Sequence, residues 1–171
     1  TWFPSVAKPI ISAINGPAAG LGLILSIWCD MRFASKSAVF STAFSKRGLI
    51  AEHGMSWLLP RLVGIGHAMD MTLTARKISA DEAEKIGFVN KTFSDEVFLK
   101  EVYKYAESLA NEVSPRSIKI MKKQLWQSLL QGLDEAVSIA DNDMVDSFSS
   151  EDFKEGVSHF IEKRAPNFTG K

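Results

Sequence analysis

An uncharged stretch from Pro9 to Cys29 most narrowly limits what this chain can fold into. Its apolar content is typical of a membrane span, and Gly16-x-x-x-Gly20 within it has the small-residue spacing of transmembrane dimers. However, Asn15-Gly16-Pro17 in its middle predicts a turn, which would leave backbone groups without hydrogen bonds in lipid. We therefore expect a buried strand, a turn and a buried helix of a globular protein, with no membrane span.

The rest of the chain mixes strands and helices first and becomes helical later. Strands are predicted over residues 10–14, 31–34, 38–42 and 88–91. Helices are predicted over residues 21–29, 56–62 and 65–73, from the capping box at Ser79 to Gly87, and in the later apolar stripes at 98–109, 115–129, 133–148 and 151–161. This order indicates an α/β core followed by a helical region.

Composition excludes several classes of protein. The 171 residues are 46% hydrophobic and 23% charged, and basic and acidic residues balance to zero net charge, so no overall field favours nucleic acid or an anionic membrane. The single Cys29 excludes an intramolecular disulfide and suits a reducing compartment. Since the start also lacks the pattern of a secretory signal, we expect a cytoplasmic protein.

Known cofactor motifs are missing from the sequence. No G-x-x-x-x-G-K-[ST] phosphate loop occurs, and Gly16, Gly20 and Gly22 have the wrong order for a dinucleotide fingerprint. The three histidines have no ligand-type spacing, which argues against a zinc site. We expect no metal.

Zero net charge hides an asymmetry that draws attention to Glu52. Residues 1–78 contain eight basic side chains but only three carboxylates, Asp30, Glu52 and Asp70. Glu52 lies in a Gly-flanked loop between apolar segments, where partial desolvation would suit proton transfer near neutral pH. An ordinary exposed loop glutamate is the alternative.

A second candidate is the glycine-bracketed turn before the buried helix. It would place free backbone N–H groups at the positive end of the helix dipole. Such an arrangement stabilises an oxyanion, and one well-placed donor contributes roughly 10²–10³ in rate. By itself the motif is weak, because glycine at a strand-to-helix turn is usually structural.

Six segments together resemble the crotonase superfamily, the enoyl-CoA hydratases and isomerases. They are KPIISAINGPAAGLG (8–22), CDMRFAS (29–35), GLI (48–50), LPRLVG (59–64), LTARKISADEA (73–83) and EGVSHFIEKR (155–164). The resemblance implies a spiral of ββα units over residues 1–92, without the first units, and a C-terminal helical region over 93–171 for trimerisation and coenzyme A contact. It further implies homotrimers or dimers of trimers, and an acyl-CoA thioester as substrate.

The resemblance also implies site residues. The Leu21 N–H would be one of two donors that hold the enolate oxygen, the other lying in family sequence that precedes Thr1. The two hydratase glutamates fall on Ile24 and Phe44, which cannot accept a proton, so hydration by the usual mechanism is not expected. Glu52 falls where some enoyl-CoA isomerases of the family carry their single acidic residue.

These matches predict an isomerase that moves a 3-enoyl-CoA double bond to the 2-position with Glu52 as proton shuttle. No flavin, nicotinamide or other cofactor is expected, since coenzyme A is part of the substrate. The substrate-binding residues would be Ala19, Gly20, Gly22, Ile24, Phe44, His53, Phe160 and Lys163. Two alternatives stay open: another crotonase reaction, such as atypical hydration or ring isomerisation, and a non-catalytic acyl-CoA-binding subunit.

Overall fold

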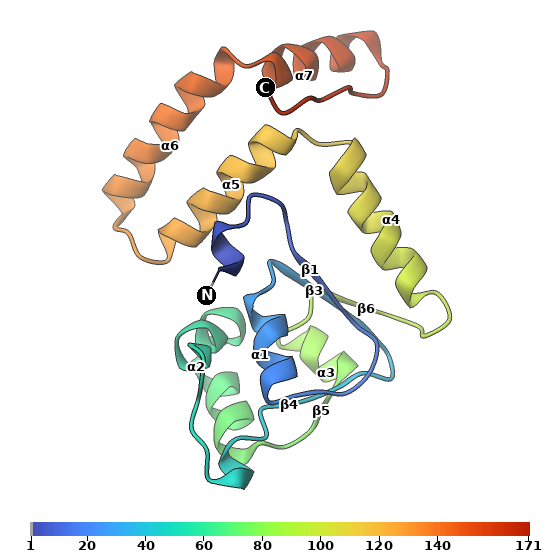
Figure 1. Cartoon of the computed structure of the whole chain (residues 1–171), viewed down its shortest axis with the longest axis vertical. Helices are drawn as coiled ribbons and strands as arrows, with labels where there is room; N and C mark the ends of the chain where they lie inside the picture. Colours follow the sequence, from blue (N-terminus) through green and yellow to red (C-terminus); the bar gives the residue numbers. More distant parts are fainter. Residues whose placement is uncertain (1) are drawn as a thin grey trace. The chain divides into compact units, whose positions relative to one another are not determined.

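The computed structural model describes residues 2–171, which form two compact units (Figure 1). One unit comprises residues 10–103, and the other comprises the residues up to Pro9 together with 104–171. The sequence predicted a boundary after residue 92, whereas the two units divide within helix α4 (Phe98–Asn111).

The unit of residues 10–103 contains six short strands. They are β1 (Ile11–Ile14), β2 (Ala18–Ala19), β3 (Met31–Ser35), β4 (Val39–Ser41), β5 (Ile78–Ser79) and β6 (Lys91–Phe93). Its helices are α1 (Leu21–Trp28), the short 3-10 turn η2 (Ser45–Arg47), α2 (Met55–Thr74), α3 (Ala80–Lys85) and the first residues of α4.

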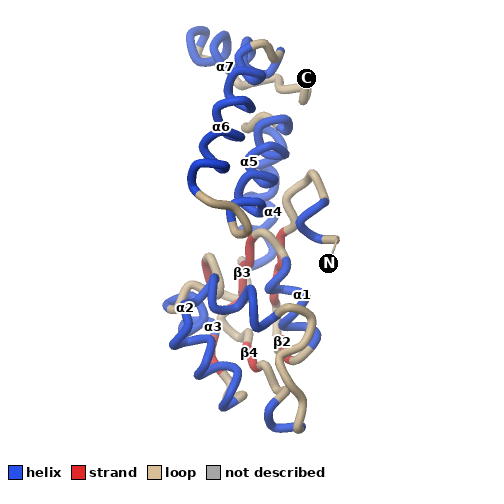
Figure 2. The backbone as a smooth tube through the Cα atoms, turned by 90° about the vertical axis from the view of Figure 1, so that its left-hand side faces the viewer, coloured by secondary structure: helices blue, strands red, loops and turns tan. Residues whose placement is uncertain are grey.

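The strands form two sheets that the chain visits in turn. One sheet has the order β1-β3-β6 and is parallel throughout; the other has the order β2-β4-β5, with β2 and β4 parallel and β5 antiparallel. In Figure 2 the segment labelled β3 lies apart from β2 and β4, which belong to the second sheet. The chain thus runs β1-β2-α1 and then β3-β4-α2, which are two successive ββα turns of a spiral.

Apolar side chains from both sheets fill this unit. Phe33 of β3 packs with Phe98 and Val102 of α4. Phe40 of β4 meets Phe88 edge-on, with ring centroids 5.3 Å apart. Burial of such side chains from water supplies about 1.5–3 kcal/mol each and drives the layers together.

Helix α1 forms as its apolar pattern predicts. Leu23, Ile24 and Ile27 are buried on one face, which is the i, i+1, i+4 spacing of a helix side. Leu21 and Leu25 are exposed, so the helix is not enclosed on all sides as the uncharged sequence suggested.

Arg32 of β3 fixes the C-terminal end of α1. Its guanidinium is buried and donates from Nη1 to the Cys29 carbonyl at 2.7 Å, and from Nε to the Phe88 carbonyl at 2.7 Å. Longer contacts of 3.4 Å reach the carbonyls of Ser26 and Ile27. Burial lowers the pKa of Arg32, but the cation lies at the negative end of the helix dipole, which favours positive charge.

The sequence misplaced one strand. It predicted a strand over residues 88–91, but β6 begins at Lys91. Residues Phe88 and Val89 are buried, yet their N–H groups bond to the Ala83 carbonyl and so close the end of α3. Asn90 then donates to the Arg32 carbonyl and accepts from the Arg32 N–H.

Helix α2 is interrupted at Gly64, where φ is 78° and ψ is 158°. The sequence predicted two helices at 56–62 and 65–73, and the break falls between them. Buried side chains before the break are Met55, Leu58, Leu59 and Val63, and those after it are Ala68 and Met71.

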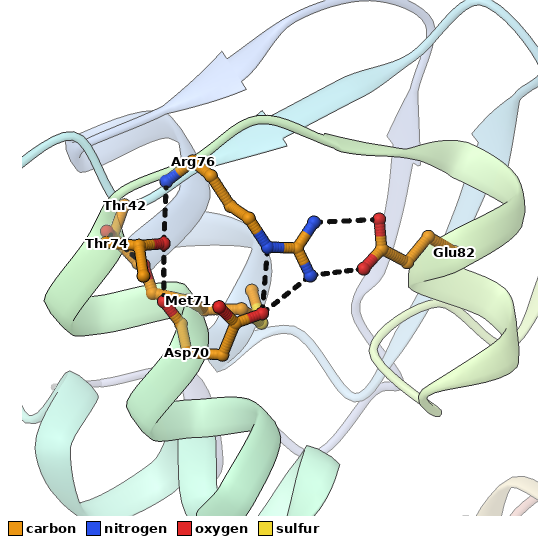
Figure 3. Close-up of polar contacts among 6 residues, drawn as sticks. All are labelled: Thr42, Asp70, Met71, Thr74, Arg76 and Glu82. Atoms are coloured by element: carbon orange, nitrogen blue, oxygen red, sulfur yellow. Dashed lines mark hydrogen bonds and ion pairs between the residues drawn. The ribbon is translucent and has the colours of Figure 1, made fainter.

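Arg76 joins the end of α2 to α3 (Figure 3). It donates to Asp70 of α2 at 2.6 Å and to both carboxylate oxygens of Glu82 in α3. These hydrogen bonds hold the pKa of both carboxyl groups below its usual range. Asp70 thus has a structural role.

The other unit consists mainly of helices. They are the short η1 (Phe3–Ser5), the last residues of α4, α5 (Pro115–Ser128), α6 (Leu133–Phe148) and α7 (Glu151–Glu162). Helices α5 and α6 pack antiparallel, and Arg116 donates to Ser147 at 2.8 Å while Gln124 donates to Asp143 at 2.9 Å. No described helix of the chain is long and apolar enough to cross a membrane.

Asp152 joins three segments of this unit. It is buried in the first turn of α7 and accepts from the Ser114 hydroxyl at 2.5 Å and from the N–H groups of Thr169 and Gly170. The Ser114 hydroxyl also accepts from the Ser117 N–H and so caps α5. Although burial raises the pKa of Asp152, these hydrogen bonds outweigh it and lower the pKa overall.

We predict that Arg32→Lys lowers the free energy of unfolding by about 2–3 kcal/mol, because an ammonium group cannot match the guanidinium's divergent donors. Arg47→Lys is the control, since Arg47 is exposed and makes one contact of 3.1 Å to the Ala43 carbonyl. This control is expected to change stability by less than about 0.5 kcal/mol. Urea unfolding measures both, and equal effects would contradict the role given to Arg32.

Candidate active site

The site is built around the turn between β2 and α1. β2 pairs with β4, and the next residue, Gly20, donates its N–H to the Ser41 carbonyl at 3.2 Å. Gly20 has φ 52° and ψ −120°, a backbone conformation that side chains with a Cβ avoid. A glycine here lets the chain reverse sharply and start the helix at Leu21.

Three N–H groups precede the first hydrogen bond within α1. The Ile24 N–H bonds to the Gly20 carbonyl at 3.1 Å, so those of Leu21, Gly22 and Leu23 have no acceptor within the helix. They lie at the positive end of the helix dipole. The Leu21 side chain is 58% exposed. This turn therefore presents donors of the kind that stabilise a developing negative charge on a carbonyl oxygen.

Ile24 and Phe44 are enclosed by protein. Their exposed fractions are 2% and 6%, and Ile24 lies one turn into α1 while Phe44 precedes η2. Neither side chain can hold or transfer a proton. Apolar groups therefore occupy both positions that the sequence resemblance matched to hydratase glutamates.

Glu52 lies in the loop between η2 and α2, as predicted. Its side chain is 36% exposed, so the desolvation expected from the sequence is partial. Its carbonyl accepts from the Met55 N–H at 2.9 Å, which closes a turn at the start of α2. The carboxylate is thus accessible to solvent, while the backbone that carries it is fixed by the turn.

His53 directly follows Glu52 along the chain, and its ring lies close to the Glu52 carboxylate. Its Nε2 lies 3.8 Å from Oε2 of Glu52, and its ring is 58% exposed. His53 has φ 51°, a left-handed conformation that is unfavourable by about 1–2 kcal/mol for a residue with a side chain. Gly54 continues the turn with φ 77°.

Trp28 connects this loop to α1. Its indole Nε1 donates to the His53 carbonyl at 3.0 Å. A Cβ placed on Gly54 would lie 2.9 Å from Cζ2 of the same ring, so the ring packs directly on the turn. Helix α1 therefore begins at the N–H donors and ends at a side chain that contacts the Glu52 loop.

The other predicted site residues are placed as follows. Ala19 and Gly22 are exposed beside the turn at Gly20. Phe160 and Lys163 belong to the helical unit, where Phe160 is 79% exposed and Lys163 ends α7 with φ 53°. Within residues 2–171, no three potential metal-ligating side chains are grouped as a metal site requires.

Comparison with known proteins identifies the family. The family model described as enoyl-CoA hydratase/isomerase matches residues 3–171. The chain belongs to this family. The crotonase superfamily membership predicted from the six sequence segments is thereby confirmed.

Curated relatives include hydratases and an isomerase. The probable enoyl-CoA hydratase EchA12 of Mycobacterium tuberculosis is 40% identical over 95% of this chain. The 1,2-epoxyphenylacetyl-CoA isomerase of Escherichia coli is 36% identical over 96%. The chain spans 58% of the first relative's length and 62% of the second's.

Solved structures of the family have the same fold. The enoyl-CoA hydratase of Bacillus anthracis superposes with a TM-score of 0.95 at 30% identity, over 99% of this chain and 65% of that one. A probable enoyl-CoA hydratase/isomerase of Mycobacterium abscessus gives 0.92 at 35% identity, over 99% and 65%. The predicted α/β crotonase fold is therefore confirmed.

Sequence reasoning did not single out Trp28 or Arg32. A tryptophan at the end of a buried helix does indicate a hydrogen bond to another segment, because a half-buried indole N–H normally has an acceptor. Which carbonyl it bonds to depends on contacts 25 residues apart along the chain. No local pattern indicates that partner.

We predict that Gly20→Ala lowers the free energy of unfolding by about 1–3 kcal/mol, because the new Cβ is strained at this φ and ψ. Gly22→Ala is the matched control, since Gly22 lies in α1 with open space around it. It is expected to leave stability unchanged or raise it by up to about 1 kcal/mol. Chemical unfolding of both variants tests the turn, and a loss as large at Gly22 as at Gly20 would contradict it.

Proposed function

We propose that the protein is an acyl-CoA isomerase that converts a 3-enoyl-CoA into the 2-enoyl-CoA. The observation that carries this proposal is a single carboxylate, Glu52, in a loop that contacts Trp28 of α1, the helix whose N-terminal N–H groups have no acceptor within the helix. Ile24 and Phe44 leave no acid or base at the other matched positions.

The proton moves from one carbon to another with no net gain or loss. The Glu52 carboxylate removes a proton from C2, and the electron pair of that C–H bond forms the enolate. The double bond shifts as the protonated Glu52 returns the proton to C4, and the carbonyl group forms again. One group that is both base and acid suffices for these two steps.

The enolate oxygen requires donors, and the Leu21 N–H is proposed as one of them. Gly20 and the first turn of α1 fix its direction before substrate arrives, so little reorganisation is needed. Ala19, Gly22 and His53 are proposed to contact the acyl thioester, and Phe160 and Lys163 the nucleotide part of coenzyme A. Ile24 and Phe44, which the sequence predicted as substrate-binding residues, are enclosed by protein and are not among the proposed contacts. We propose no metal or redox cofactor, because the thioester itself acidifies C2.

Hydration is the second candidate, because several relatives at 35–40% identity are named hydratases. Adding water across a double bond uses an acid and a base that act on water and carbon. With Ile24 and Phe44 buried and apolar, only Glu52 among the matched positions could serve. A non-catalytic acyl-CoA-binding subunit is the remaining alternative.

Assembly into homotrimers or dimers of trimers is proposed from the helical unit. Helix α6 has no buried residue in the single chain. Five of its large apolar side chains are exposed, namely Leu133, Val137, Met144, Val145 and Phe148. A helix with an uncovered apolar stripe is typical of a subunit contact.

We also propose that the protein is located in the cytoplasm.

We predict that Glu52→Gln lowers kcat for 3-enoyl-CoA isomerisation by at least about 10²-fold, because the amide cannot carry the proton. Formation of the conjugated thioester is followed by absorbance, and products by chromatography. Glu107→Gln, an exposed change in α4, is the control and should leave kcat unchanged.

Three results would overturn the proposal. Isomerisation unaltered by Glu52→Gln excludes the proton shuttle. Conversion of 2-enoyl-CoA to the 3-hydroxy product without isomerisation favours hydration. Binding of acyl-CoA by the intact protein with turnover of neither substrate favours the binding subunit.

We predict that the intact protein sediments as a trimer or hexamer. Val137→Glu combined with Met144→Glu should shift it to smaller species, because two charges would enter an apolar contact. Asn142→Glu, on another side of α6, is the control and should leave the sedimentation unchanged. A monomeric wild-type protein would contradict this assembly.

A further inference from the structure

We infer that Trp28 is a positioning residue that sets the location of the Glu52 carboxylate, an inference that rests on the proposed function of Glu52. The indole contacts the loop at the two residues that follow Glu52. It donates to the His53 carbonyl at 3.0 Å and packs against the Gly54 backbone. Both contacts are made with the backbone of the loop, so Trp28 acts on Glu52 through the backbone.

The backbone at this turn needs such support. His53 and Gly54 both have positive φ, at 51° and 77°, and the first of these conformations is unfavourable for histidine. Surrounding contacts must therefore maintain it. A hydrogen bond to the His53 carbonyl fixes the peptide plane between His53 and Gly54, and so the direction in which the chain leaves Glu52.

The backbone on either side of Trp28 is held in place by Arg32. The carbonyls on either side of it, those of Ile27 and Cys29, accept from the buried Arg32 guanidinium at 3.4 and 2.7 Å. Its ring is half-buried, which restricts its rotamers. The end of α1 that carries Trp28 is thus held by Arg32, and partial burial limits the positions open to the indole.

The same helix carries the proposed oxyanion donor. Leu21 and Trp28 are the first and last residues of α1, separated along its axis by about 10 Å at 1.5 Å per residue. One rigid element therefore holds the Leu21 N–H at one end and the Glu52 loop at the other. This coupling fixes the spacing between the enolate oxygen and the proton shuttle.

The test is Trp28→Phe in the intact protein, which keeps an aromatic ring but removes the indole N–H. We expect kcat for isomerisation to fall about tenfold, the size of effect that loss of one hydrogen bond can cause. KM and the affinity for a saturated acyl-CoA, which binds but cannot isomerise, should change less than about twofold. Trp126→Phe in α5, also a half-buried tryptophan, is the matched control and should leave kcat unchanged.

A combined variant separates positioning from general structural damage. In a Glu52→Gln background, Trp28→Phe should lower the residual turnover by less than about twofold. The effects of the two substitutions are not additive if Trp28 acts only by positioning the Glu52 carboxylate. Gly54→Ala disturbs the same turn, both because alanine is strained at φ 77° and because its Cβ would meet the Trp28 ring, and it should also lower kcat if Trp28→Phe fails to fold.

The outcomes distinguish the two proposals. If Glu52→Gln abolishes turnover but Trp28→Phe leaves kcat unchanged, the positioning role is wrong and the isomerase stands. An equal loss in both backgrounds, or a change mainly in KM, also overturns the positioning role. If Glu52→Gln leaves turnover unchanged, the proposed function fails, whatever Trp28→Phe does.

Discussion

The buried guanidinium of Arg32 is the interaction on which the arrangement of residues 10–103 depends. It ties the last turn of α1, the strand β3 and the segment that ends α3, through the carbonyls of Cys29 and Phe88. A charge in such a place is unfavourable unless several acceptors surround it. Here one acceptor is the Cys29 carbonyl, directly after the last residue of α1, and another is the Phe88 carbonyl, in the segment after α3, so the same contacts satisfy the charge and the carbonyls.

Helix α1 is fixed at both of its ends. Its N-terminus is set by Gly20, which turns the chain after β2 and donates its N–H to Ser41 of β4, and its C-terminus is set by Arg32. With both ends fixed, the free N–H groups at Leu21 and the indole at Trp28 are held in one rigid body. The loop of Glu52 has no regular structure of its own and takes its conformation from α2 and from that indole.

Much of the fold was predictable because its signals are local. The caps at Ser79 and Ser114 and the helix stop at Gly87 mark boundaries through chemistry within one turn, and all three predictions are confirmed. The strand predicted over 88–91 was wrong. Phe88 and Val89 are buried apolar residues, which favours a strand, but their N–H groups bond to the Ala83 carbonyl at the end of α3 and not to another strand. Residues 18–19 and 78–79 form strands only through pairing with β4, a partner that no local pattern specifies.

The candidate site was predictable to a similar degree. Glu52 stands out because carboxylates are scarce in the first 78 residues, and the turn at Gly20 because of its glycines. The structure places Glu52 in a loop between η2 and α2 and Gly20 at the turn before α1. The contacts that join them were not predictable, since Trp28 and Arg32 act on residues 25 and 56 positions away.

The interruption of α2 at Gly64 has a consequence for the way this helix can vary. In an unbroken helix the buried face of Leu58, Leu59 and Val63 would continue through residues 66 and 70, but Ala68 and Met71 are buried instead. The non-helical glycine therefore resets the angular phase of the second half. Each half of α2 therefore packs its own buried face, and the orientation of the half that follows the Glu52 loop does not determine which side chains the second half buries.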